Sequence, residues 1–95
     1  MTRRYDPKLL HALRNDIDIA ELIADVLDWP SKTAEGQFRF LCPICSEFNS
    51  ATNPKTNLAR CFRCQRNFNP IDMVMTVREC TFVQAVQFLR KSIRL

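Results

Sequence analysis

Two Cys-x-x-Cys pairs, Cys42–Cys45 and Cys61–Cys64, stand fifteen residues apart in this chain. A Cys-x-x-Cys turn directs two sulfurs into one space. Two such turns that face each other supply four thiolates at the corners of a tetrahedron, the geometry that Zn²⁺ prefers. The spacing therefore predicts one zinc ion held by Cys42, Cys45, Cys61 and Cys64. Four protein ligands leave no open position for an activated water, so we expect a structural metal. Redox sensing, in which oxidation ejects the zinc, stays open as an alternative use of these thiols.

The size of the chain and its cysteine count agree with a metal site. Its 95 residues suffice for one small domain, which we expect to span residues 1–95. A core of that size is thin, so an additional cross-link such as zinc is expected. Five cysteines, an odd number, fit four ligands plus Cys80 better than a disulfide framework. Cys80 is expected to be a small residue buried between helices. His11, the single histidine, is expected to be a surface or half-buried side chain and not a ligand.

The sequence carries no targeting or membrane signal that we can identify. Residues 1–7 are polar and lack the apolar core of a signal peptide. No stretch approaches the roughly eighteen apolar residues of a membrane span. We therefore expect a cytoplasmic protein without membrane association, in a compartment where cysteines stay reduced and available to a metal.

Charge is unevenly distributed along the chain. Residues 1–35 carry five basic and seven acidic side chains, whereas residues 36–95 carry nine basic and three acidic ones. The formal net charge is +4, and four thiolates bound to one Zn²⁺ would reduce it to about +2. The half that holds the cysteines stays basic, which suits an anionic partner such as nucleic acid.

Apolar spacing and capping residues predict helices on both sides of the cysteines. Pro7 can open a short helix, and residues 15–28 form a second one, capped by Asp16 or Asp18 and stopped by Pro30. Trp29 is expected to cover the core. After the cysteines, Asn69 caps a helix that begins at Pro70 and ends near residue 79. A last helix follows the capping box that Thr81 begins, with an apolar stripe of Phe82, Ala85, Val86, Leu89 and Ile93.

Between the helices, two short strands are predicted to lead into the two cysteine pairs. Residues 38–41 alternate, with Phe38 and Phe40 on one face and Arg39 on the other. Residues 58–62 form the second strand. Residues 31–36 are predicted to be a polar turn, and residues 46–57 a polar loop. Two antiparallel strands bridged by metal form a zinc ribbon, so the predicted fold class is α+β, a small antiparallel zinc-ribbon sheet flanked by N-terminal and C-terminal helices.

Basic and aromatic side chains interleave around the ribbon. Single-stranded nucleic acid is held by cations along its phosphates and by aromatic faces under its bases. On this basis we predict a nucleic-acid-binding set of Arg39, Lys55, Arg60, Phe62, Arg63 and Arg66. The competing interpretation is that the phenylalanines belong to the core and the arginines only keep the protein soluble. A second basic group on the last helix, Arg90, Lys91 and Arg94, is expected to be a solvated helix end.

These motifs, in this order, resemble the N-terminal zinc-binding domain of bacterial-type DNA primases. The resemblance covers residues 7–90, and its most specific part is Cys61-Phe62-x-Cys64 followed by Asn69-x-Ile71-Asp72. Two departures stand at the metal site: Cys45 takes the place where the family usually has His, and residues 65–68 replace the glycines that usually follow the last Cys. The polymerising domain of primases is absent from this chain, which is therefore expected to be a free-standing module or a fragment.

The resemblance implies a zinc-dependent module that binds single-stranded DNA template in replication and primer synthesis. It implies no catalysis by this chain, and a separate partner, a primase catalytic domain or another replication protein. The alternative is a regulatory or protein-interaction zinc ribbon that docks a replication or mobile-element protein.

Overall fold

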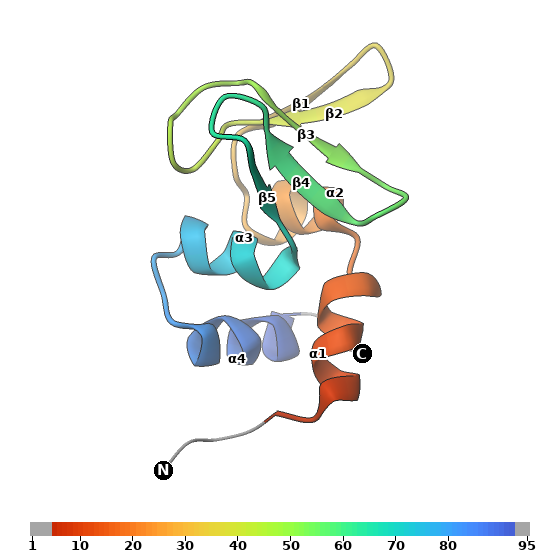
Figure 1. The fold of residues 1–95 in the computed structure, drawn as a ribbon, viewed down its shortest axis with the longest axis vertical. Helices are drawn as coiled ribbons and strands as arrows, with labels where there is room; N and C mark the ends of the chain where they lie inside the picture. The colour runs from red at the N-terminus through yellow and green to blue at the C-terminus, as the bar shows by residue number, and fades with distance from the viewer. Residues whose placement is uncertain (1–4, 93–95) are drawn as a thin grey trace.

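The computed structural model describes residues 5–92, in which helices, a sheet and again helices follow one another (Figure 1). The first elements are α1 (Pro7–Asn15), α2 (Ile19–Glu21) and the π-helical turn η1 (Leu22–Val26). The sheet consists of β1 (Ser31–Ala34), β2 (Gln37–Phe40), β3 (Ser50–Asn53), β4 (Leu58–Cys61) and β5 (Arg66–Phe68). The last elements are α3 (Pro70–Val77) and α4 (Phe82–Ser92). The α+β class predicted from the sequence is confirmed.

The five strands form an antiparallel sheet in the order in which they occur along the chain. Alternate residues of a strand point to opposite faces, and here one face is buried and the other meets solvent. Phe40, Cys61 and Phe68 are fully buried on the inner face. Arg39 and Arg60 lie on the outer face, as the alternation of β2 and β4 predicts.

Three of these strands, β1, β3 and β5, were not expected from the sequence, and β5 pairs with β4. Residues 31–36, predicted to be a polar turn, contain β1, which pairs with β2, and the turn itself is confined to residues 35–36. The predicted loop 46–57 contains β3, which lies between β2 and β4. The two strands expected to pair with each other are therefore separated by a third. Propensity missed β3 because its sequence, Ser-Ala-Thr-Asn, is polar, whereas Ser50 and Ala51 are buried by the neighbouring strands.

The helix predicted over residues 15–28 is divided. α1 extends to Asn15, and a new helical segment starts only at Ile19, where the Asp18 carboxylate accepts hydrogen bonds from the N–H groups of Ala20 and Glu21. The next turn, η1, is π-helical, with hydrogen bonds between residues five apart. Of the two predicted caps, Asp18 is thus the one used. The change of direction lets Ile19 and Ile23 face the sheet while Leu22 faces the other helices.

The buried side chains form two clusters that share two elements. One cluster unites α1, α3 and α4 through Leu13, Ile71, Val74 and Leu89. The other lies under the sheet and includes the cysteines Cys42 and Cys61 together with Phe40, Phe68 and Met73. Trp29 packs on the sheet cluster, as predicted, and its Nε1–H donates to the Leu41 carbonyl at 2.6 Å. Because α3 and the α2–η1 segment contribute to both clusters, they connect the sheet to the helical end of the molecule (Figure 1).

The predicted starts of the last two helices are confirmed by reciprocal hydrogen bonds. At α3 the Asn69 side chain accepts from the Asp72 N–H, and the Asp72 carboxylate accepts from the Asn69 N–H. At α4 Thr81 and Gln84 exchange the same pair of bonds. Ile93 and Arg94, which were assigned to the last helix, lie outside the described residues. No helix within residues 5–92 is long and apolar enough to cross a membrane.

Asn57, in the turn between β3 and β4, ties the sheet to the N-terminal helices. Its side-chain N–H₂ donates to the carbonyls of Arg14 (2.7 Å) and Ile17 (2.6 Å), and its side-chain oxygen accepts from the Ile19 N–H (3.0 Å). Its backbone is in the left-handed region, at φ 57°, which Asn tolerates better than other residues with side chains. The amide therefore satisfies three backbone groups at the break between α1 and α2.

We predict that Asn57→Gly lowers the free energy of unfolding by about 3 kcal/mol, because it keeps the left-handed backbone and removes three hydrogen bonds of about 1 kcal/mol each. Asn57→Ala should cost about 1 kcal/mol more, because Ala is strained at that φ. Urea unfolding at saturating zinc measures both. Asn53→Ala is the control, since the Asn53 side-chain oxygen accepts only the exposed Lys55 N–H. Equal stability of Asn57→Gly and the parent protein would contradict this role.

Candidate metal centre

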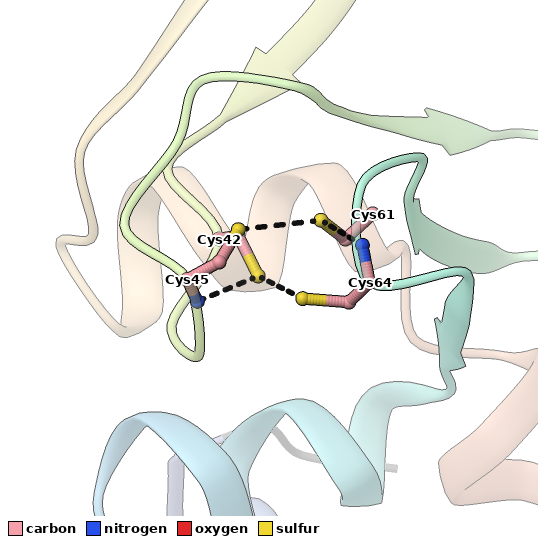
Figure 2. Close-up of side chains that lie close together, drawn as sticks. All are labelled: Cys42, Cys45, Cys61 and Cys64. Atoms are coloured by element: carbon pink, nitrogen blue, oxygen red, sulfur yellow. Dashed lines mark hydrogen bonds between the residues drawn. The ribbon is translucent and has the colours of Figure 1, made fainter.

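The two predicted cysteine pairs lie on loops that follow β2 and β4. Cys42 comes two residues after the end of β2, and Cys61 is the last residue of β4, so both strands deliver their loops to the same end of the sheet. Figure 2 shows the sulfurs of Cys42, Cys45, Cys61 and Cys64 turned toward one another between the two loops. All four sulfurs lie within 4.8 Å of one another.

The spacing of the sulfurs fits a tetrahedral zinc ion. With Zn–S bonds of about 2.3 Å, the edge of an ideal tetrahedron is about 3.8 Å. Cys42 Sγ lies 3.9 Å from Cys64 Sγ, and Cys45 Sγ lies 3.7 Å from Cys61 Sγ. Four cysteine sulfurs are a typical donor set for structural zinc, and they leave no ligand position open. The chain thus has a cluster that can hold one zinc ion, as the spacing predicted.

The two loops repeat the same local geometry. In the first, the Cys45 N–H points at Cys42 Sγ (3.5 Å) and the Ser46 N–H donates to the Cys42 carbonyl. In the second, the Cys64 N–H points at Cys61 Sγ (3.3 Å) and the Gln65 N–H donates to the Cys61 carbonyl. Backbone N–H groups aimed at a thiolate stabilise its negative charge and fix its orientation.

Both loops leave the metal site through a residue in the left-handed region, Ser46 at φ 61° and Gln65 at φ 56°. A glycine would adopt this backbone without strain. The glycine usually found after the last cysteine of primase zinc domains is therefore replaced by Gln65 without loss of the turn.

The surroundings of Cys42, Cys61 and Cys64 shift the pKa values of their thiols in different directions. Burial raises the pKa of Cys42, and burial together with the neighbouring sulfurs raises that of Cys64 to about 12. Burial acts in the same direction on Cys61, but the Cys64 N–H, the Ser50 hydroxyl and the adjacent sulfurs outweigh it and lower its pKa to about 6. Without metal, the cluster therefore keeps protons on Cys42 and Cys64 at neutral pH, and zinc must displace them.

The remaining cysteine and the histidine lie away from this cluster. Cys80 is half-buried against the helical core, and its S–H points at the Val74 carbonyl. His11 is exposed on α1 beside Asn15. Neither belongs to the group of metal-binding side chains found among the described residues.

The predicted nucleic-acid-binding residues do not all lie on one surface of the protein. Arg39 and Arg60 stand in one row across the outer face of the sheet, on either side of Ala51. Phe62, one residue beyond β4, is 55% exposed, and it lines a surface hollow of about 420 Å³ together with Arg60 and Asn67. These three predicted residues, Arg39, Arg60 and Phe62, are thus brought to one side of the sheet.

Arg63, Arg66 and Lys55 are placed elsewhere. Arg63 forms an exposed ion pair with Glu47 at 3.2 Å. Arg66 is paired with Cys61 in the sheet register, so it lies on the opposite face from Arg60, and its guanidinium lies 5.5 Å from the centre of the Phe68 ring. Lys55 is exposed in the turn between β3 and β4, at the end of these strands away from the cysteines.

Sequence reasoning missed two further residues on this side. Lys32 pairs with Arg39 in the register and extends the cationic row onto β1. Its Nζ lies 5.2 Å from the centre of the Phe48 ring, which is 40% exposed. The available signal for Lys32 was only its place between the small residues Ser31 and Thr33. It was masked by the polar composition that predicted a turn there.

The chain matches the model of a known protein family. A family model described as CHC2 zinc finger matches residues 5–95, nearly the whole chain. No curated protein matches the chain.

We predict that the folded protein contains one zinc ion per chain, measured by metal analysis after gel filtration. Cys42→Ala or Cys61→Ala should abolish zinc binding, because each variant removes one of the four sulfur ligands. Cys80→Ser is the matched control and should keep the full metal content. A chelator should remove the near-ultraviolet circular dichroism of Trp29, which packs on the sheet core. A metal-free protein with the same spectrum would contradict the structural role.

Zinc affinity should rise with pH. The pKa of Cys42 is raised and that of Cys64 is about 12, so both thiols are protonated at neutral pH and lose their protons when zinc binds. Each proton released makes the apparent association constant about tenfold larger per pH unit. We therefore expect a rise of at least about a hundredfold per unit between about pH 7 and 8, in competition with a chelator whose own pH dependence is known. A slope of tenfold or less would contradict these protonation states.

Proposed function

Because the chain belongs to the CHC2 zinc finger family, the primase-type zinc ribbon, we propose that it binds single-stranded DNA template in replication. In this proposal, the outer face of the sheet holds the strand while a separate primase catalytic domain or other replication protein performs the polymerisation. The family match and the four-cysteine cluster support a zinc-binding module. The template role is our proposal, and it depends on the surface that the module presents.

One observation carries the proposal: among the residues that the structure describes, neither Arg39 nor Arg60 has an acidic partner. The Arg60 guanidinium donates to the side-chain oxygen of Asn67 at 3.0 Å, and that of Arg39 donates to the side-chain oxygen of Gln37 at 3.2 Å. Both partners are neutral amides, which orient the guanidinium groups and leave their charges uncompensated. The backbones of Arg39 and Arg60 are two strand-to-strand spacings apart, each of roughly 4.8 Å. Such a row suits a chain of phosphates that crosses the strands.

Phe62 adds an aromatic surface next to this row. Its ring is the most exposed large apolar side chain in the described part of the molecule. A base stacked on an exposed aromatic ring contributes about 1–3 kcal/mol and requires no particular sequence. Phe48 beside Lys32 offers a second such ring. Arg63, Arg66 and Lys55 remain candidates, although the Glu47 partner of Arg63 already balances its charge.

The metal centre has a structural role in this proposal. Four sulfurs close the coordination sphere, so no water is activated there. Zinc would instead fix the loops that carry Phe62 and Arg63 at the end of the sheet. We accordingly propose that this chain does not catalyse a reaction by itself.

Docking of a replication or mobile-element protein is the second candidate function. It is supported by Arg90 and Lys91 on α4, which are exposed and line hollows together with Gln87. α4 lies at the end of the molecule away from the sheet (Figure 1). A partner bound there would leave the outer face of the sheet free, so the two functions are compatible.

We predict that the protein binds fluorescent oligodeoxynucleotides in anisotropy titrations at low salt. Replacing both Arg39 and Arg60 by Gln should weaken binding and reduce the slope of log K against log [salt] by about 1.4, because each phosphate contact on a single strand contributes about 0.7. Phe62→Ala should weaken binding by about 1–3 kcal/mol with an unchanged slope, because it removes stacking and no charge.

The matched control is Arg90→Gln with Lys91→Gln, which removes the same charge from α4. If the outer face of the sheet holds the strand, the control keeps the parent slope. Equal losses in both double variants would mean that only the net charge matters and would refute the assigned face. No binding at low salt would refute template binding and leave protein docking as the function to test.

A further inference from the structure

Ser50 is a buried polar residue whose hydroxyl lacks a conventional hydrogen-bond partner. Its side chain is fully buried, and it is the only buried polar side chain among the described residues. It has no hydrogen-bond partner among the described residues, sulfurs included. A hydroxyl left in this state costs about 1–3 kcal/mol. A buried hydroxyl in a native fold normally has a hydrogen-bond partner, and the described hydrogen bonds do not provide one for Ser50.

The register of the sheet places Ser50 against a metal-binding cysteine. Ser50 is paired with Cys61 on one side and with Phe40 on the other, and all three side chains are buried on the inner face. Directly paired residues have Cβ atoms about 4.5–5.5 Å apart, which brings a Ser hydroxyl within reach of a Cys sulfur. Phe40 offers no acceptor. Cys61 Sγ is thus the polar atom available to the hydroxyl.

The hydrogen bonds to the sulfurs leave room for this donor. Cys42 Sγ lies 3.4 Å from the Ile44 N–H nitrogen and 3.5 Å from that of Cys45. Among the described residues, Cys61 Sγ is approached by one backbone N–H only, that of Cys64. Cys61 Sγ therefore faces one backbone N–H donor, whereas Cys42 Sγ faces two.

We propose that the Ser50 hydroxyl donates a hydrogen bond to Sγ of Cys61 when that thiolate binds zinc, and that Ser50 is a positioning residue of the metal centre. The bond satisfies the buried hydroxyl and withdraws negative charge from the sulfur. It holds the Cys61 side chain in the orientation that closes the tetrahedron. It also makes the sulfur a weaker nucleophile, so electrophiles react less readily. Zinc leaves more slowly because the sulfur is held in the orientation that the ion requires. Partners of this kind typically change metal affinity by about 10–100-fold.

Ser50→Ala tests the proposal in the full chain. We expect zinc affinity, measured against a chromophoric chelator, to fall by about tenfold and zinc release to become faster. In the Co²⁺-substituted protein, the sulfur-to-metal charge-transfer band should move to longer wavelength, because the thiolate loses a donor and its electrons are bound less tightly. A packing role alone would not move this band.

Two further variants complete the experiment. Ser50→Thr keeps the hydroxyl and should restore the parent band position. Thr52→Val removes a hydroxyl from the same face of β3, opposite Ala59 and away from the sulfurs, and should leave affinity and spectrum unchanged. The proposal is overturned if Ser50→Ala binds zinc as tightly as the parent with the same Co²⁺ spectrum. In that case the hydroxyl is an unsatisfied group whose removal stabilises the fold. These readouts do not involve nucleic acid, so they are independent of the proposed function.

Discussion

The geometry of this small protein depends on four sulfurs that lie close enough to share one metal ion. Structural zinc contributes roughly 10–16 kcal/mol of apparent binding free energy at neutral pH, which is comparable to the whole stability of an ordinary small domain. Cys42 and Cys61 are also part of the hydrophobic core beneath the sheet. Metal coordination and apolar packing therefore act at the same place, and both hold the ends of the strands that deliver the cysteine loops.

Local patterns allowed a large part of this structure to be predicted. The metal cluster follows from cysteine spacing, and the starts of α3 and α4 follow from Asn69 and Thr81, because a cap involves residues only three apart. β1, β3 and β5 could not be predicted in the same way. Ser50 is polar, and its burial depends on Phe40 and Cys61, which come from other strands. The prediction failed where burial is decided by distant neighbours.

The nucleic-acid candidates illustrate the same limit. Alternation along one strand places Arg60 and Cys61 on opposite faces, since a face is a local property of one strand. It could not tell that Arg66, only two residues after the last cysteine, would lie on the other face, because that depends on the register of β5 against β4. It also could not tell that Arg63 would pair with Glu47. A cationic surface is a tertiary arrangement, and composition gives only its total charge.

The repeated geometry of the two cysteine loops has a consequence for how the protein acquires its metal. Each loop sets its two cysteines and its N–H···S bond within a few residues, so each can form a two-sulfur half-site before the sheet is complete. An incoming ion can bind first to either half-site. The other half-site then reaches the ion when the fifteen-residue segment between the two cysteine pairs closes into a loop. Closing a loop of about that length takes well under a microsecond. Loading therefore has two entry routes, and strand β3 is assembled within the segment that closes.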